Sequence, residues 1–214
     1  MRLLPTTLVL AAAALAFIPA AHAQVPAPAP SASPSAPLIV NGNFDDPTDP
    51  LKGWITDYEW EGNSHYIGNK KHVSIVTEGA RKNVVKFDNN GDDGVKMECR
   101  AFPIEPGFKY ICTMDVKCEA CRIYFAGYQW KPGVHPHDNP ELGELRMIYK
   151  SKAAEHVSKD WAPVKIELPG VALSPQALEF LKKLRYLTVY IWMAKPGFVD
   201  NVTVTKVADP SMKF

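Results

Sequence analysis

Two short stretches near opposite ends of the chain decide the fold. The first is Leu38-Ile39-Val40-Asn41-Gly42-Asn43-Phe44-Asp45, with Trp54 soon after it, and the second is Gly197-Phe198-Val199-Asp200-Asn201-Val202-Thr203-Val204. Each joins strand-forming residues to acidic and amide side chains. We expect the two stretches to meet at one edge of a β-sandwich and so to close a single domain.

The sequence between these stretches consists mostly of short alternating runs. From Val73 onward, apolar and polar residues alternate over a few positions at a time, and Gly, Pro, Asn and Asp separate the runs. This pattern predicts an all-β, antiparallel jelly-roll sandwich over residues 38–208, with a C-terminal tail over 209–214. The exception is the stretch after Ser174-Pro175, which predicts one short helix with Ser174 as its N-cap.

The N-terminal residues 1–23 have the features of a secretory signal peptide. Arg2 provides a positive start, an apolar run extends from Leu8 to Ile18, and Ala21-His22-Ala23 forms a small-x-small cleavage site. The run is too short for a transmembrane helix, which needs about 20 apolar residues. We therefore expect a secreted or periplasmic protein. Residues 24–37 are rich in Pro, Ala and Ser and predict an extended linker.

Positive and negative charges are balanced. The chain has 24 Lys and Arg against 23 Asp and Glu, for a formal net charge of +1, and removal of Arg2 with the signal peptide would make it neutral. A neutral chain of mixed charge argues against nucleic acid or an anionic membrane as partner. We expect a monomer whose ligand is uncharged or only locally charged.

Two neighbouring runs predict a β-hairpin. In residues 110–116 the even positions are apolar, and in residues 122–130 the odd positions start an apolar face. A turn centred on Glu119-Ala120 sets Val116 opposite Ile123, and both strands then agree on which face is buried. We therefore expect an antiparallel hairpin with one face in the core.

The four cysteines permit two disulfides in an exported chain. They are Cys99, Cys112, Cys118 and Cys121. Cys118 and Cys121 flank the predicted turn, whereas Cys99 and Cys112 both point inward, so we favour pairing 99 with 112 and 118 with 121. The alternative is that Cys99 and Cys112 are small buried hydrophobic residues. Zinc is disfavoured because the Cys-x-x-Cys has no second pair at zinc-finger spacing.

Large aromatic residues outside the core predict a binding site for sugars. Pyranose rings have flat C–H faces that stack on Trp and Tyr, and contiguous exposed apolar patches often mark binding sites. The predicted hairpin and the run 186–193 place such rings on their non-core faces. The candidate ligand-binding residues are Tyr124, Tyr128, Trp130, Tyr190 and Trp192, with Asp115 as a polar neighbour and Arg122 and Gln129 as further hydrogen-bonding candidates. Alternatively, the helix or the long segment 131–152 covers these rings as a second layer of core.

Two acidic residues at the chain ends suggest a metal site. If the end stretches meet, Asp45 and Asp200 come close together, and their hard oxygen ligands suit a structural Ca²⁺ ion. The alternative is that Asp45 caps a turn and Asp200 pairs locally. Trp54 and Trp161 are expected to be packing residues.

The end motifs resemble those of a known family. Asn-Gly-x-Phe-Asp at 41–45, Gly-Trp at 53–54 and Val-Asp-Asn-Val-x-Val at 199–204 are similar to the CenC-type carbohydrate-binding modules, over residues 38–207. That resemblance implies a galactose-binding-like jelly roll that binds polysaccharide or oligosaccharide without catalysis. It also implies a sugar cleft across one sheet at the aromatic residues named above. The first motif has Asp45 where the family usually has Glu.

Two other functions remain open. A structural or protein-binding domain of the cell envelope would have the same fold with its aromatic rings covered. A glycan hydrolase would need two carboxylates about 5–9 Å apart in a cleft, with Asp115 and Glu141 or Glu144 as first candidates. No Ser-His-Asp arrangement, phosphate loop or nucleophile elbow appears in the sequence.

Overall fold

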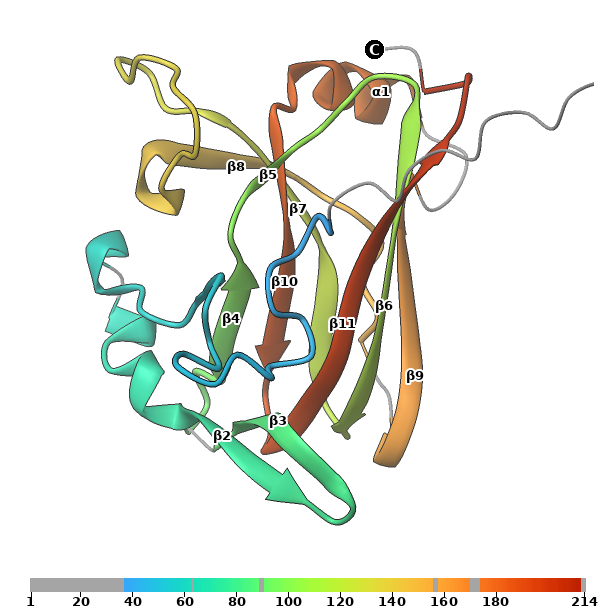
Figure 1. Cartoon of the computed structure of the whole chain (residues 1–214). Helices are drawn as coiled ribbons and strands as arrows, with labels where there is room; N and C mark the ends of the chain where they lie inside the picture. Colours follow the sequence, from blue (N-terminus) through green and yellow to red (C-terminus); the bar gives the residue numbers. More distant parts are fainter. Residues whose placement is uncertain (1–36, 63, 89–90, 156–157, 170–173, 213–214) are drawn as a thin grey trace, which may run out of the picture. The chain divides into compact units, whose positions relative to one another are not determined.

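Two antiparallel β-sheets pack face to face around a shared core, as the alternating sequence predicts (Figure 1). The computed structural model describes residues 37–62, 64–88, 91–155, 158–169 and 174–212. The predicted signal peptide (1–23) and all but the last residue of the predicted linker (24–37) lie outside the described residues. Within these ranges, no helix is long and apolar enough to cross a membrane.

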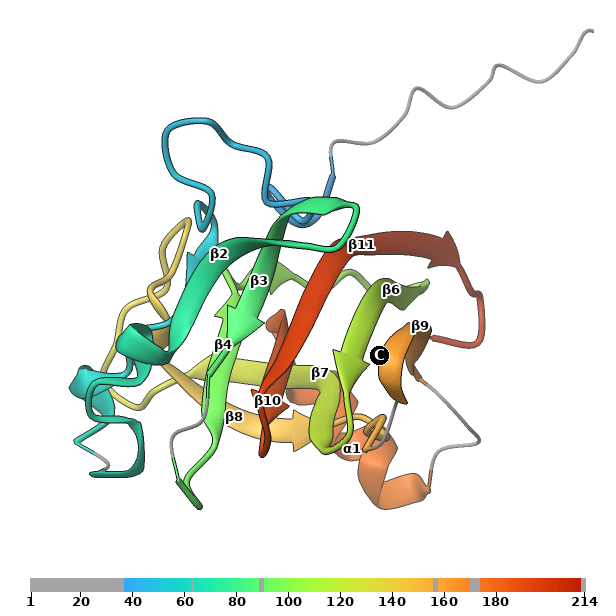
Figure 2. The same ribbon diagram turned by 90° about the horizontal axis from the view of Figure 1, so that it is seen from below.

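The strands divide into a six-stranded and a five-stranded sheet, which Figure 2 shows as two layers. The six-stranded sheet has the order β1-β4-β10-β7-β8, and β5 also pairs with β10. Its strands are β1 (Trp54–Ile55), β4 (Val95–Cys99), β5 (Phe102–Pro103), β7 (Cys121–Trp130), β8 (Leu145–Lys150) and β10 (Tyr186–Met193). The five-stranded sheet has the order β2-β3-β11-β6-β9. Its strands are β2 (Val73–Glu78), β3 (Arg81–Phe87), β6 (Phe108–Cys118), β9 (Ser158–Leu168) and β11 (Gly197–Ala208).

The predicted helix is present as α1 (Pro175–Lys183). The Ser174 hydroxyl accepts a hydrogen bond from the Ala177 backbone N–H at 3.2 Å, which confirms the predicted N-cap. Leu181 is fully buried in the core, whereas Leu178 and Phe180 stay 40% and 37% exposed. Only part of the apolar face is therefore packed. Short 3-10 helices are η1 (Glu59–Glu61), η2 (Ser64–Tyr66), η3 (Asn69–His72) and η4 (Leu142–Glu144).

The two end stretches meet, as expected. The Val202 backbone N–H donates to the Gly42 carbonyl oxygen at 2.8 Å. A Cβ atom on Gly42 would lie 1.8 Å from the Val202 carbonyl oxygen, so the approach requires glycine. Nearby, Trp54 packs on Phe44 with ring centroids 5.3 Å apart and donates its indole N–H to the Asn41 carbonyl oxygen at 3.1 Å. The packing role of Trp54 is confirmed.

The predicted hairpin is wrong, because β6 and β7 belong to different sheets. Strand β6 pairs with β9 and β11, and β7 pairs with β8 and β10. The chain crosses from one sheet to the other between Cys118 and Cys121. Val116 and Ile123 are both buried in the core, as predicted, but they approach it from opposite layers. An inward-facing pattern fits two strands across a core as well as two neighbours in one sheet.

This crossing separates residues that the hairpin would have placed on one face. Thr113 and Asp115 lie on the outer side of the five-stranded sheet, whereas Tyr124 and Tyr128 lie on the outer side of the six-stranded sheet. The prediction that Asp115 lies beside the aromatic residues is therefore wrong.

A second apolar layer covers part of the six-stranded sheet on the side away from the main core. The segment with η1 to η3 and the segment before β8 pack there (Figure 1). The buried members of this layer are Tyr58, Tyr124, Ala126, Tyr128, Leu142, Leu145 and Tyr190. The alternative that some of the predicted rings form a second layer of core is confirmed.

All four cysteines are free and buried. Cys99 on β4 and Cys112 on β6 lie in the main core, on opposite sheets. Burial raises the pKa of the Cys99 thiol to about 12 and that of Cys112 well above its usual value. Cys118 and Cys121 flank the crossing, and the interaction with Cys121 lowers the pKa of the Cys118 thiol to about 7. Both disulfide pairings stay predictions.

Candidate functional site

The centre of the candidate site is a pair of tyrosines on neighbouring strands. The register of β7 and β10 places Tyr124 opposite Tyr190 and Arg122 opposite Trp192. The two tyrosine rings are stacked, with centroids 4.5 Å apart and an interplanar angle of 13°. The Arg122 guanidinium carbon lies 5.4 Å from the Trp192 ring centroid. Side chains directly opposite on one sheet face interact in this way because their Cβ atoms are close.

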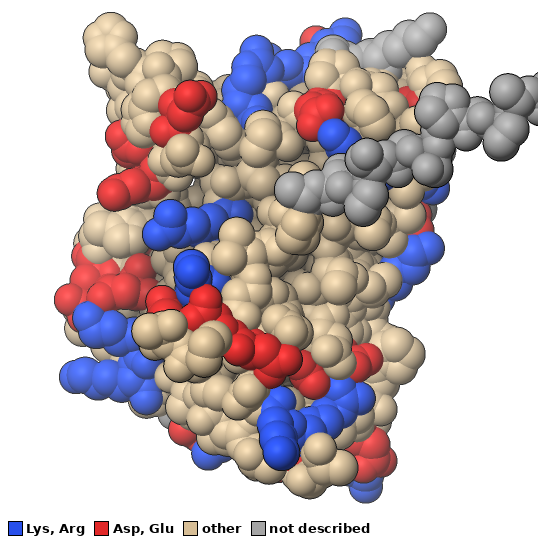
Figure 3. All heavy atoms as spheres, in the orientation of Figure 1, with Lys and Arg blue, Asp and Glu red and all other residues tan. Residues whose placement is uncertain are grey.

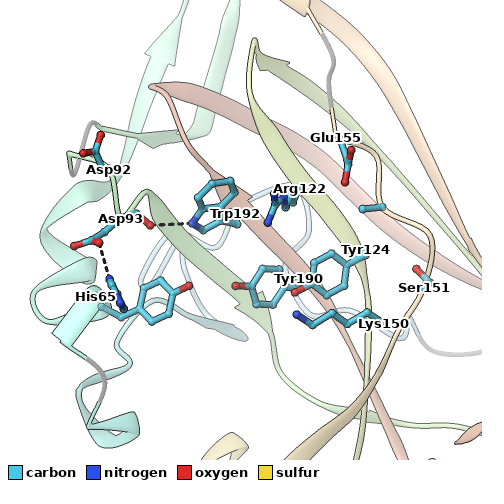
Figure 4. A pocket seen from close by; sticks show the side chains of 12 residues that line it. His65, Asp92, Asp93, Arg122, Tyr124, Lys150, Ser151, Glu155, Tyr190 and Trp192 are labelled. Atoms are coloured by element: carbon cyan, nitrogen blue, oxygen red, sulfur yellow. Dashed lines mark hydrogen bonds and ion pairs between the residues drawn. The ribbon is translucent and has the colours of Figure 1, made fainter.

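These four side chains line a pocket of about 510 Å³, here called the aromatic pocket (Figure 4). This volume lies within the range of about 300–1,000 Å³ that is usual for small-molecule sites. The other lining residues come from η2, the turn before β4, the end of β8 and the segment after it. They are His65, Tyr66, Asp92, Asp93, Lys150, Ser151, Ala153 and Glu155.

One wall of the aromatic pocket is fixed by hydrogen bonds across the turn before β4. His65 Nδ1 lies 2.6 Å from Asp93 Oδ1, and the Trp192 indole N–H donates to the Asp93 carbonyl oxygen at 3.0 Å (Figure 4). A Cβ atom on Gly94 would lie 2.6 Å from the Trp192 ring, so the turn backbone packs directly against the indole. Trp192 is thus held in place while it stays partly exposed.

The tyrosines supply hydroxyl groups that remain protonated. Burial raises the pKa of both Tyr124 and Tyr190. Tyr66 also lines the aromatic pocket, which therefore contains three tyrosines. Neutral hydroxyls both donate and accept hydrogen bonds. Lys150, whose Nζ lies 5.5 Å from the Tyr124 ring centroid, adds a cationic donor.

A buried acid lies beneath the tyrosines. Glu98 Oε2 accepts hydrogen bonds from the Tyr128 hydroxyl at 2.6 Å and the Thr188 hydroxyl at 2.7 Å. Glu98 Oε1 has no hydrogen-bond partner among the described residues and lies 3.7 Å from Lys96 Nζ. Burial raises the pKa of Glu98, against the opposing effect of the Lys96 charge.

Lys96 connects the second apolar layer to the six-stranded sheet. Its side chain is 5% exposed, and its Nζ lies 2.7 Å from Glu61 Oε1. The same ammonium group lies 3.7 Å from the Tyr58 ring centroid and 4.4 Å from that of Tyr66. Such cation–π contacts become stronger when the cation is desolvated. Lys96 therefore positions Tyr66, which lines the aromatic pocket.

The structure brings three of the predicted aromatic residues together and leaves two apart. Tyr124, Tyr190 and Trp192 line the aromatic pocket. Tyr128 is 4% exposed, and its hydroxyl donates a hydrogen bond to Glu98. Trp130 packs edge-on against Tyr186, with ring centroids 5.6 Å apart, and does not line the pocket.

The predicted calcium ligands already have protein partners. Arg81 Nη1 donates to Asp200 Oδ2 at 3.0 Å, and the Asn83 side-chain amide donates to Asp45 Oδ1 at 2.8 Å. Nowhere in the described ranges do three or more His, Cys, Asp or Glu side chains gather as a metal site. A Ca²⁺ ion bound by Asp200 would have to displace the Arg81 guanidinium. Calcium at Asp45 and Asp200 stays a prediction.

The acids suggested for a hydrolase are not gathered. Asp115 lies on the five-stranded sheet and is hydrogen-bonded by Arg81 at 2.7 Å. Glu141 and Glu144 lie beside the six-stranded sheet, where they form a capping box around η4. Glu144 Oε1 also lies 3.0 Å from His137 Nε2. None of the three lines the aromatic pocket.

Sequence reasoning missed several residues of this region. Lys96 and Glu98 alternate with core residues on β4 and therefore read as a solvent-facing pair, although both are buried. The missed lining residues include Tyr66 and Lys150. The available signal was the aromatic stretch from Tyr58 to Tyr66, which has too many large rings for a solvated loop.

Comparisons with known proteins find similarity only among solved structures. No family model and no curated protein matches the chain. One similar structure holds the CBM22-1 and GH10 modules of a Clostridium thermocellum xylanase with xylohexaose. The sequence identity is 11% and the TM-score is 0.43, and the match covers 79% of this chain and 28% of that one. A family 61 carbohydrate-binding module bound to β-1,4-galactotriose shows 14% identity and a TM-score of 0.40, covering 81% of this chain and 100% of the module. A family 4 carbohydrate-binding module shows 14% identity and a TM-score of 0.41, covering 79% and 99%. Likeness at this level is confined to the arrangement of strands.

Proposed function

We propose that this chain binds a glycan in the aromatic pocket and does not transform it. The observation that carries the proposal is the joint presence of Tyr124, Tyr190 and Trp192 with hydrogen-bonding groups in one pocket of sugar-binding size. Aromatic rings offer apolar surface to the C–H face of a pyranose, and the surrounding polar groups match its hydroxyls.

The chemistry of the pocket favours modest affinity. Trp192 and Tyr66 are the partly exposed rings of the pocket, and the Arg122 and Lys150 side chains that line it can donate to sugar oxygens. An aromatic contact contributes about 0.5–1.5 kcal/mol beyond its buried area. Because about 1.4 kcal/mol changes a dissociation constant tenfold, a few such contacts give micromolar to millimolar binding.

We propose that the protein acts outside the cytoplasm. Residues 1–23 support export through their signal-like sequence. We propose a monomeric, secreted or periplasmic glycan-binding domain that is preceded by the linker over 24–37. The finer assignment to the CenC-type modules rests on the end motifs, whose Gly42 and Val202 are in contact.

A fluorescence titration tests the proposal. The folded chain is titrated with soluble glucans, xylans and galactans while its tryptophan emission is recorded. We expect saturable quenching by at least one glycan, and we expect Trp192→Ala and Arg122→Gln to weaken binding about tenfold or more. Trp161→Ala is the control, because Trp161 lies on β9 in the other sheet.

Two outcomes would contradict the proposal. Retention of binding in Trp192→Ala, with loss in Trp161→Ala, would mean that the sugar binds to the five-stranded sheet. A folded, stable protein that responds to no glycan would favour a structural or protein-binding domain.

A further inference from the structure

Trp60, on η1, lines two hollows that are separate from the aromatic pocket. One hollow of about 410 Å³ is lined by Trp60 together with Arg100 and Glu141. The other, of about 310 Å³, is lined by Trp60 together with Lys131 and Arg146. Leu142 also lines both hollows, and neither shares a lining residue with the aromatic pocket. Trp60 and Leu142 therefore border both hollows.

The Trp60 ring is held in position yet remains accessible. It is 46% exposed, which is high for a tryptophan beside a packed layer. A Cβ atom on Gly143 would lie 3.5 Å from the ring, so the backbone of η4 supports it from one side. The Lys131 ammonium lies 5.6 Å from the ring centroid and donates to the Gly143 carbonyl oxygen. A supported, half-exposed ring is a ready surface for stacking.

Two of the acidic side chains near Trp60 are already engaged, whereas Glu59, also on η1, is exposed. Glu61 is paired with the buried Lys96 at 2.7 Å. The Glu141 carboxylate accepts the backbone N–H of Glu144 in the capping box of η4. Glu61 is thus already paired with a cation, and the Glu141 carboxylate keeps its charge while it accepts one backbone N–H.

The cations beside Trp60 lack such partners. Within the part of the chain that the structure describes, no carboxylate forms an ion pair with Arg100, Lys131 or Arg146. Arg100 and Arg146 are exposed, one in each hollow. Each hollow beside the ring therefore contains an arginine outside any ion pair among the described residues, although the protein face in Figure 3 carries mixed charges.

We propose that Trp60 and these cations form a second site, which binds a saccharide whose sugar rings carry carboxylates. Trp60 offers a stacking surface for the C–H face of a sugar. Each arginine can bind a carboxylate through two parallel N–H···O hydrogen bonds. Two hollows that border one ring fit consecutive sugars of an oligomer better than a single small anion. The mixed charge elsewhere favours an acidic saccharide over nucleic acid, which needs a wide basic surface.

Calorimetric titration with tetragalacturonate, against neutral galactotetraose, tests this site on the folded chain. We expect the acidic probe to bind more tightly, with an affinity that falls as salt rises. Trp60→Ala and Arg146→Gln should each weaken tetragalacturonate binding about tenfold, equivalent to about 1.4 kcal/mol. The matched controls, Phe180→Ala and Lys159→Gln, remove an exposed ring on α1 and an exposed cation on β9 and should change nothing.

The two sites are told apart by their variants. Loss of acidic-probe binding in Trp60→Ala with retention in Trp192→Ala supports the second site, whether or not the aromatic pocket binds a neutral glycan. The reverse result would overturn it, as would equal affinity for both probes or no binding of tetragalacturonate. Equal or tighter binding of a single-stranded oligonucleotide would overturn the ligand class. Arg146→Gln changes only an exposed side chain, so it decides the question if Trp60→Ala fails to fold.

Discussion

Asp115 and Asp200 lie directly opposite each other in the antiparallel register of β6 and β11. Like charges in such a position destabilise a sheet. The Arg81 guanidinium resolves the conflict by donating to Asp115 at 2.7 Å and to Asp200 at 3.0 Å. Its hydrogen bond to Asp115, with the charges of both acids, raises the pKa of Arg81 despite partial burial. Arg81 on β3 thus serves as the counter-ion for two carboxylates, one on β6 and one on β11.

Replacing Arg81 by methionine should lower the free energy of unfolding by roughly 1–3 kcal/mol at neutral pH. The apolar stem is kept, so the loss comes from two facing carboxylates left without a cation. Urea unfolding of Arg81→Met measures the change. Lys82→Met is the control, because Lys82 is exposed on the same strand.

The effect of Arg81→Met should depend on pH. Partial burial acts to raise the pKa of Asp115, but hydrogen bonds from Asn201 and Arg81 and the Arg81 charge lower it below 3.8 overall. An acid whose pKa is lowered on folding stabilises the protein above its unfolded pKa and loses this contribution as pH falls through the folded pKa. The two proteins should therefore converge in stability as the pH falls below 3.8. A difference that persists unchanged in acid would contradict the ion-pair explanation.

The sequence predicts which residues face the core but not how the strands are joined. Alternation placed Val116 and Ile123 inside correctly, because period two is a local property of a strand. Sheet partners depend on contacts far apart in the chain, and a crossing at Glu119-Ala120 gives the same inward pattern as a hairpin. The contact of Gly42 with Val202 was predictable only because both lie in recognisable end motifs.

The candidate site was predictable only in part, because alternation shows which face of a strand carries a side chain but not which segment folds over that face. Alternation on β10 exposes Tyr190 and Trp192 on the outer face, and both line the aromatic pocket. The irregular segment with η1 to η3 has no periodicity that would show it folding back over the sheet. The burial of Lys96 and Glu98 beneath that segment could therefore not be inferred from β4 alone.

Glu98 should make the protein less stable as the pH rises. Burial raises the pKa of this carboxyl from 4.5, so the folded state holds a proton that the unfolded state has released. Its contribution to stability is present below pH 4.5 and is lost as pH rises through the folded pKa. We expect the stability of the wild type relative to Glu98→Gln to fall over this range, by at most about 1.4 kcal/mol per pH unit.

Urea unfolding at several pH values between mildly acidic and neutral measures this difference. Glu119→Gln is the matched control, because it makes the same chemical change at a side chain that is 56% exposed. Parallel pH profiles for wild type and Glu98→Gln would show that Glu98 titrates alike in the folded and unfolded states, against our expectation.

Cys118 and Cys121 should oxidise to a disulfide before Cys99 and Cys112 do. The hydrogen bond from Cys121 lowers the pKa of Cys118, and the thiolate is the reactive form. Burial raises the pKa of Cys99 and Cys112, which keeps them as thiols. After brief treatment with oxidised glutathione and alkylation, peptide mass spectrometry should find the 118–121 bridge first. Initial formation of the 99–112 bridge, or of a mixed pair, would contradict the prediction.

The contact between the two ends of the domain should tolerate no side chain at position 42. A methyl group there would lie 1.8 Å from the Val202 carbonyl oxygen, and the Val202 N–H that now donates to Gly42 would have to move. We expect Gly42→Ala to cost about 3 kcal/mol of unfolding free energy, the upper end of what overpacking costs in a tight core. Gly143→Ala is the matched control, because its new Cβ would meet Trp60 at an ordinary contact distance of 3.5 Å. Thermal unfolding followed by circular dichroism compares the two. Equal melting temperatures would mean that closure of the sandwich at this edge contributes little to stability.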